Sequence, residues 1–137
     1  MANITTQAEF PLWTTGRRKH SVARVRVTQG SGQLLVNDQS VNDYFGGHVR
    51  ARAHATAPLH LARGTSGYDF FVTVTGGGVS GQSGAIQLGL ARAIVEIEPN
   101  LRTALKKDGF LTRDPRMVER KKPGQPKARR RFQHSKR

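Results

Sequence analysis

The sequence contains no cysteine, few acidic residues and no long apolar run. The absence of cysteine excludes disulfide bonds and thiolate chemistry, and it fits a reducing compartment. No stretch approaches the ~20 apolar residues that a membrane-spanning helix needs. The first ten residues, MANITTQAEF, have no basic segment, no apolar core and no arginine. We therefore expect neither a signal peptide nor a transit peptide at this end.

Positive charge dominates the composition and is unevenly spread. The chain has 23 lysines and arginines against 9 acidic residues, a net charge of +14. Residues 113–137 hold 11 of the basic residues and only two of the acidic ones. Such a surplus predicts a polyanionic partner. Nucleic acid is favoured over an anionic membrane surface, because the basic C-terminal segment is broken by prolines and lacks the apolar stripe of a membrane-binding helix.

The charge distribution divides the chain into two parts. We expect a globular domain over residues 1–112 and an extended basic tail over residues 113–137, which has too little apolar surface to fold alone. Fully extended, the tail spans roughly 80 Å, whereas the body should have a radius of gyration of only ~13 Å. A merely solubilising arm is the alternative. Arginine clustering, the aromatic Phe132 and the spaced prolines favour specific binding.

Apolar periodicity predicts a mixed α/β fold. Residues 21–29 alternate, with Ala23, Val25 and Val27 on one side and Arg24 and Arg26 on the other. We expect further strands over 10–15, 33–36 and 68–75, the second of them antiparallel to 21–29, and helices over 40–45, 49–56, 80–98 and 100–108. Residues 16–20 should form a turn, and Pro58 should interrupt its helix. The order predicts an α+β or α/β two-layer sandwich with one mixed sheet.

A glycine-rich stretch raises the question of an enzyme. Gly76–Gly81 (GGGVSG) fits G-x-G-x-x-G between a strand and a helix, as in dinucleotide-binding folds. That motif requires an acidic residue at the end of the next strand, and no such strand follows. The glycines can still admit an anion, including an RNA phosphate, to the helix N-terminus. Phosphate contact and close packing of the loop fit the pattern equally well.

Other candidate sites carry less weight. His48, His54 and His60 recur every six residues, which does not place them on one helix face, so we expect no metal site. No catalytic set of side chains stands out, and we expect neither catalysis nor a cofactor. The cluster Arg17, Arg18, Lys19, Arg24 and Arg26 is either a solvated surface or a phosphate-binding face, and its density favours phosphate.

Six stretches carry a family resemblance: TGRRKHSVARV (15–25), DYF (43–45), TVTGGGVSGQSGAI (73–86), LTRDPRMVERKK (111–122), KARR (127–130) and SKR (135–137). The chain resembles the bacterial-type small-subunit ribosomal protein nine family. Residues 49–63 match the family poorly, so their structure is predicted from pattern alone.

The resemblance implies a structural constituent of the small-subunit head that binds 16S-type rRNA beside neighbouring head proteins. It implies the α/β sandwich of the second domain of ribosomal protein five, with helices on one face of the sheet and a left-handed β-α-β crossover. It places the protein in the cytoplasmic ribosome of a bacterium or in an organellar ribosome such as that of the chloroplast. The alternative is a histone-like protein that binds nucleic acid without specificity.

The resemblance also assigns roles to residues. The tail would thread through rRNA towards the peptidyl (P) site, where Ser135, Lys136 and Arg137 would contact the anticodon stem-loop of the tRNA. Together with the basic cluster and the glycine loop, the rRNA-binding set is Arg17, Arg18, Lys19, Arg24, Arg26, Gly76, Gly77, Gly78, Ser80, Gly81, Gln82, Arg113, Arg116, Arg120, Lys121, Lys122, Lys127, Arg129, Arg130 and Arg131.

Overall fold

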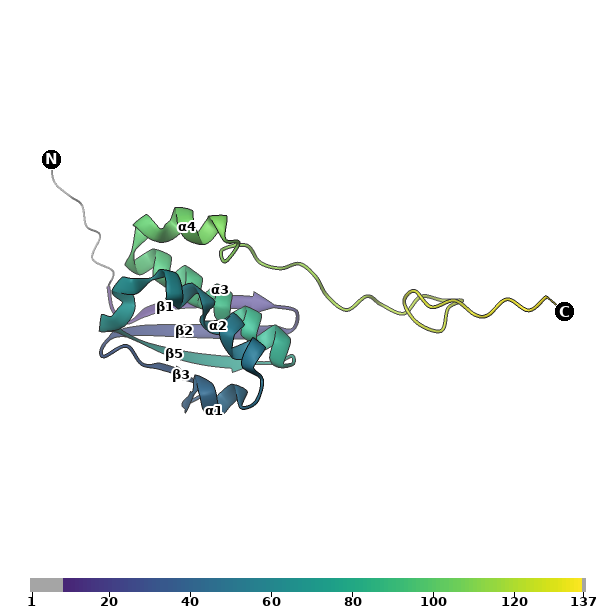
Figure 1. The fold of residues 1–137 in the computed structure, drawn as a ribbon, viewed down its shortest axis with the longest axis horizontal. Helices are drawn as coiled ribbons and strands as arrows, with labels where there is room; N and C mark the ends of the chain where they lie inside the picture. The colour runs from purple at the N-terminus through teal and green to yellow at the C-terminus, as the bar shows by residue number, and fades with distance from the viewer. Residues whose placement is uncertain (1–8, 137) are drawn as a thin grey trace.

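A five-stranded mixed sheet with helices packed on one face forms the body of the protein (Figure 1). The computed structural model describes residues 9–136. The strand order is β1-β2-β5-β3-β4. The strands are β1 Leu12–Arg18, β2 Ser21–Gln29, β3 Leu34–Val36, β4 Gln39–Ser40 and β5 Tyr68–Thr75. The helices are α1 Val41–Phe45, α2 Val49–Leu61, α3 Val79–Ile97 and α4 Arg102–Lys107, with 3₁₀ turns η1 Arg63–Gly67 and η2 Pro99–Leu101.

Strand β2 carries the centre of the core. Ala23, Val25 and Val27 are fully buried, and β2 pairs antiparallel with β1 on one side and β5 on the other. The predicted bounds of β2 and β5, and the inward side of β2, are confirmed. Alternation is a dependable signal here because only one face of the sheet is covered by helices.

The turn predicted over residues 16–20 is wrong in its extent. Strand β1 continues through Arg17 and Arg18, which pair with Val22 and Ser21, so that only two residues form the hairpin loop. Gly16 lies inside the strand because β1 approaches α3 closely there. A Cβ atom on Gly16 would overlap the carbonyl oxygen of Ala85. The glycine therefore marks close packing rather than a turn.

Strand β3 runs antiparallel to β2, as the short link predicted, but the two strands do not pair. Strand β5 lies between them and pairs parallel with β3. The link crosses the start of β5, where Asp69 Oδ1 accepts hydrogen bonds of 2.9 Å from the backbone amides of Ser31, Gly32 and Gln33. These bonds, that from Gln33 foremost, lower the pKa of Asp69. A carboxylate 36 to 38 residues away thus fixes the link.

Helix α1 begins as predicted, with the Ser40 hydroxyl accepting from the Asp43 amide. The interruption predicted at Pro58 is wrong, since α2 continues to Leu61. Proline at this position cannot donate to the carbonyl of His54. The side-chain amide of Gln87 donates to that carbonyl instead, at 2.9 Å. A neighbouring helix therefore supplies the bond that the proline removes.

Helix α3 lies across the sheet with Ile86, Leu90 and Ile94 fully buried, close to its predicted range. The last predicted helix is confirmed in part, because its first turn is the 3₁₀ turn η2 and α4 follows. Phe110 and Leu111 pack against a cluster of Ala62, Ile94 and Leu105. They hold the chain to the body just before the tail begins.

Residues 113–136 contain no helix or strand and extend away from the body (Figure 1). One local loop interrupts their course. Glu119 pairs with Lys122 at 2.7 Å and with Arg129 at 2.8 Å. Hydrogen bonds from these two side chains lower the pKa of Glu119 to about 2.

Candidate nucleic-acid interface

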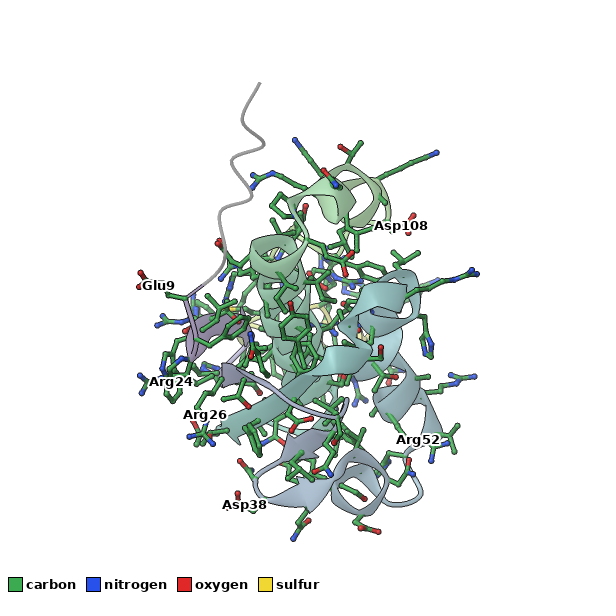
Figure 2. The ribbon with its side chains drawn as sticks, turned by 90° about the vertical axis from the view of Figure 1, so that its left-hand side faces the viewer. Glu9, Arg24, Arg26, Asp38, Arg52 and Asp108 are labelled. Atoms are coloured by element: carbon green, nitrogen blue, oxygen red, sulfur yellow. The ribbon has the colours of Figure 1, made fainter. Side chains whose placement is uncertain are left out.

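The uncovered face of the sheet presents two arginines that rest on aromatic rings. The Arg24 guanidinium carbon lies 4.3 Å from the ring centroid of Trp13, and that of Arg26 lies 4.7 Å from Phe71. We call Trp13, Arg24, Arg26 and Phe71 the open sheet face. Figure 2 shows Arg24 and Arg26 on the side of the molecule opposite Arg52 of α2. Stacking restricts each guanidinium while its N–H edge can still reach a phosphate.

Sequence reasoning found the arginines of this face but not the rings beneath them. Trp13 and Phe71 are the two cross-strand neighbours of Arg26 in the register. Trp13 is 49% exposed, which is unusual for so large an apolar side chain. The rings lie on β1 and β5, so only the pairing of these strands with β2 brings them next to the arginines.

A second surface brings the end of β1 to the start of the tail. Arg17, Arg18, Arg113 and Arg116 line one cavity of about 160 Å³, which we call the arginine pocket. Four of the predicted binding residues thus converge, although nearly a hundred positions of sequence separate Arg17 and Arg18 from Arg113 and Arg116. Lys19 follows in the hairpin loop with a positive φ of 52°. Such clustering concentrates positive potential at one point of the surface.

Asp114 organises this pocket. Arg116 binds it through Nη2 at 2.8 Å, with Nε 3.0 Å from the other carboxylate oxygen, and Arg18 Nη2 approaches at 3.2 Å. These contacts, the Arg116 hydrogen bonds first, hold the pKa of Asp114 well below its usual range. The Arg18 side chain is only 16% exposed and also donates to the Ser80 carbonyl at 3.4 Å. Arg18 therefore joins the tail to α3, whereas Arg17 faces solvent.

The glycine loop divides between packing and exposure. Gly76 and Gly77 have φ angles of 74° and 65°, which favour glycine. A Cβ atom on Gly77 or Gly81 would meet the hydroxyl of Ser21, which itself donates to the Gly76 carbonyl at 2.9 Å. These three glycines therefore serve packing.

The rest of the loop is accessible. Gly78 has open space around it, and Ser80 is exposed in the first turn of α3. Gln82 is engaged, since its amide donates to the Gly76 carbonyl and its carbonyl oxygen accepts from the Tyr44 hydroxyl at 2.6 Å. Gly78 and Ser80 remain the positions of the loop that an anion can approach.

The basic side chains of the tail are exposed. Lys122 and Arg129 are paired with Glu119. Arg116 is paired with Asp114. The others in the predicted set are exposed without an acidic partner within salt-bridge distance among residues 9–136, namely Arg113, Arg120, Lys121, Lys127, Arg130 and Arg131. Ser135 and Lys136 are exposed near the end, and the assignment of Arg137 lies outside the described residues.

Two other kinds of site are absent from the described part of the chain. No three histidine, cysteine or acidic side chains there lie close enough together to hold a metal ion. Nor does any described helix combine the length and apolar character that crossing a bilayer demands.

Comparison with known proteins decides the family. The model of a family described as ribosomal protein S9/S16 matches residues 16–137. The chain belongs to the ribosomal protein S9/S16 family. The match contains the whole arginine pocket, the glycine loop and the tail. Since this is a family of structural proteins, the expectation of a non-enzymatic protein is confirmed and the dinucleotide-dependent enzyme is rejected.

Named relatives in this family come from two Chlorobium species. The small ribosomal subunit proteins uS9 of Chlorobium limicola and Chlorobium luteolum are each 54% identical to the chain over 124 residues. The aligned region covers 90% of this chain and 95% of each relative. The relatives therefore match it at nearly full length, body and tail together.

Proposed function

We propose that this protein is a structural constituent of the small ribosomal subunit, in the head, and that it binds 16S-type rRNA. The convergence of Arg17, Arg113 and Arg116 on one cavity carries the proposal. A guanidinium offers five N–H donors, of which Asp114 takes only those on Nε and Nη2 of Arg116. The remaining donors suit phosphate oxygens, which arginine binds with two parallel hydrogen bonds.

The body binds rRNA through three surfaces under this proposal. They are the open sheet face, the arginine pocket with Lys19, and the exposed part of the glycine loop. Gly76, Gly77, Gly81, Gln82 and Arg18 act by holding these surfaces in place. Phosphate contacts fix the position of such a protein on RNA and supply most of its affinity.

The tail has a separate role. We propose that residues 1–112 and 113–137 are distinct binding units, and that the tail neutralises rRNA phosphates along its course. Its end, Ser135, Lys136 and Arg137, contacts the anticodon stem-loop of P-site tRNA. An extended chain of this length reaches far beyond the body's own footprint. Apart from the local loop at Glu119, a tail of this composition orders only when a polyanion is present.

Finer features of the fold and setting belong to the same proposal. The crossover from β3 to β5 is left-handed, and the sheet resembles that in the second domain of ribosomal protein five. Neighbouring proteins of the head are the other partners. The protein acts in the ribosome of a bacterial cytoplasm or of an organelle.

Competition binding at fixed salt tests the proposal. The full-length protein should prefer an rRNA fragment of the subunit head over random-sequence DNA by at least about a hundredfold. The protein in cells should also sediment with small subunits through a high-salt wash. Equal affinity for the two nucleic acids would favour a histone-like protein, and recovery only as free protein would contradict a ribosomal role.

A further inference from the structure

A cavity of about 770 Å³ lies between the first turns of α2 and α3, and two residues of the predicted rRNA-binding set, Arg18 and Ser80, line it. It lies beside the arginine pocket, because Arg18 and His54 line both cavities. Its volume is within the range of pockets that bind small molecules. The side chains that matter for its chemistry are Arg18, His48, Val49, Arg50, His54 and Val79.

The cavity has the charge of an anion site. None of the ten described residues that line it is acidic, and two of them are arginines. Arg18 Nε is buried and has no hydrogen-bond partner among the described residues, although the other nitrogens of its guanidinium are engaged. Because Nε is buried and the other nitrogens are engaged, Arg18 contributes positive charge to the cavity rather than an accessible donor. The dipoles of α2 and α3, neither of which has a side-chain cap, only add to this charge.

The cavity also has apolar walls that a free phosphate ion would not use. Val49 is 59% exposed and Val79 is 39% exposed, and both line the cavity. Exposed aliphatic side chains beside cationic ones match a ligand that has a charged group and a flat apolar face. An unpaired nucleotide is such a ligand, since it combines an anionic phosphate with a base whose face is flat and apolar.

We propose that this cavity binds one unpaired nucleotide of RNA, with its phosphate held by Arg50 close to the positive charge of Arg18, and its base or ribose against Val49 and Val79. The inference rests on the proposed rRNA binding and extends it to a new site. The two cavities are adjacent, because Arg18 and His54 line both. An RNA strand whose backbone crosses the arginine pocket would therefore reach this cavity next. The imidazoles of His48 and His54 provide further donors or acceptors for the base edge.

Paired substitutions along one helix test the site. Arg50→Gln removes a cation at the cavity, and Arg63→Gln removes an exposed cation just beyond the other end of α2. For binding to the head rRNA fragment, Arg50→Gln should lower affinity about tenfold and make the logarithmic salt slope less negative by about one. Arg63→Gln should change affinity less than twofold. Equal losses would overturn the site, because they would reflect general electrostatics.

A second pair tests the apolar walls. Val49→Asp should reduce affinity by tenfold or more, whereas Leu61→Asp, at the exposed end of the same helix, should have little effect. Circular dichroism and thermal unfolding establish that each variant folds. If the unmodified protein does not bind the rRNA fragment, the proposed function fails and the site with it. If it binds and the cavity variants bind equally well, only the site fails.

The absence of cysteine permits a direct test of the partner's class. A photoreactive group on the single cysteine of Val49→Cys, in assembled small subunits, should cross-link to rRNA at an unpaired nucleotide. The same group on Leu61→Cys should not label that nucleotide. Cross-linking of Val49→Cys to a neighbouring protein instead would overturn the proposal.

Discussion

The side-chain amide of Gln87 donates a 2.9 Å hydrogen bond to the carbonyl oxygen of His54, four residues before Pro58. That carbonyl would accept from residue 58 in an ordinary helix. The bond keeps α2 continuous through a proline and joins it to α3. It also fixes His54, which lines both the arginine pocket and the larger cavity.

This relationship predicts a coupling between Gln87 and Pro58. Gln87→Leu should lower the free energy of unfolding by about 1 kcal/mol, because it leaves the His54 carbonyl without its partner. In a Pro58→Ala background the alanine N–H takes over, so the same change should cost much less. Urea denaturation of the four proteins gives the coupling energy. Equal costs in both backgrounds would contradict the role assigned to Gln87.

The open sheet face predicts that an aromatic ring improves phosphate binding without changing charge. Trp13→Leu should weaken binding to the head rRNA fragment about threefold, because Arg24 loses the ring that orients it. The salt slope should stay as in the unmodified protein. Arg24→Gln should instead reduce that slope by about one. Unchanged affinity for Trp13→Leu would show that stacking does not contribute.

The close packing of Gly16 against α3 predicts that a single added methyl group strongly lowers the free energy of unfolding. Gly16→Ala should lower the free energy of unfolding by about 2–3 kcal/mol, because the new Cβ meets backbone atoms of Ala85 and Gly89 that cannot move aside. Gly47→Ala is the matched control, since a Cβ there has nothing within 4 Å. It should change stability by less than ~1 kcal/mol. Thermal or urea unfolding measures both, and similar values would mean that β1 and α3 can separate easily.

The pairing of Glu119 predicts how the tail responds to acid. Its pKa is lowered to about 2, so the contribution of its ion pairs to the loop should be fully present above the ordinary glutamate pKa of ~4.3 and lost as the pH falls through about 2. Because the group is exposed, about 1 M salt should bring its pKa back towards the ordinary value. Carbon-detected NMR titration of the carboxyl group measures this. An ordinary midpoint at low salt would mean that the loop is not populated.

Truncation at the end of the tail should weaken tRNA binding while leaving subunit assembly almost unchanged. Deletion of Lys136 and Arg137 removes two of 23 basic residues, so subunits should assemble almost normally. Retention of tRNA in the P site should fall, which filter binding with purified subunits measures. Subunits that hold tRNA equally well with and without these residues would refute the role proposed for the terminus.

Local patterns predicted the parts of the fold that depend on local chemistry. The alternation over Ser21–Gln29 was sufficient to predict strand β2, and the spacing of Ile86, Leu90 and Ile94 was sufficient to predict helix α3. In each case the period of the buried face specifies the type of element. The neighbour of β3 could not be predicted in this way. Asp69 decides it by binding the link from 36 to 38 residues away. Likewise, nothing near Pro58 in the sequence shows that Gln87 will compensate for it.

The candidate site likewise combines features that local sequence predicts with features that depend on contacts between distant residues. Residue type and density predicted that Arg17, Arg113 and Arg116 bind a polyanion, but their convergence depends on how the chain leaves α4. The cavity beside Val49 and Arg50 was missed, because residues 49–63 carry no strong periodicity. Its lining comes from the starts of two helices that only the folded chain brings together.

The position of β5 between β2 and β3 sets an order for folding during synthesis. The hairpin of β1 and β2 can form early, yet its inner edge has no partner until Tyr68–Thr75 has been made. Strand β3 likewise has no parallel partner until the same segment, β5, has been made. A nascent chain therefore carries two open strand edges over some forty residues of translation, the state in which association with other chains is most probable. Completion of the sheet depends on its last strand, which is also its centre.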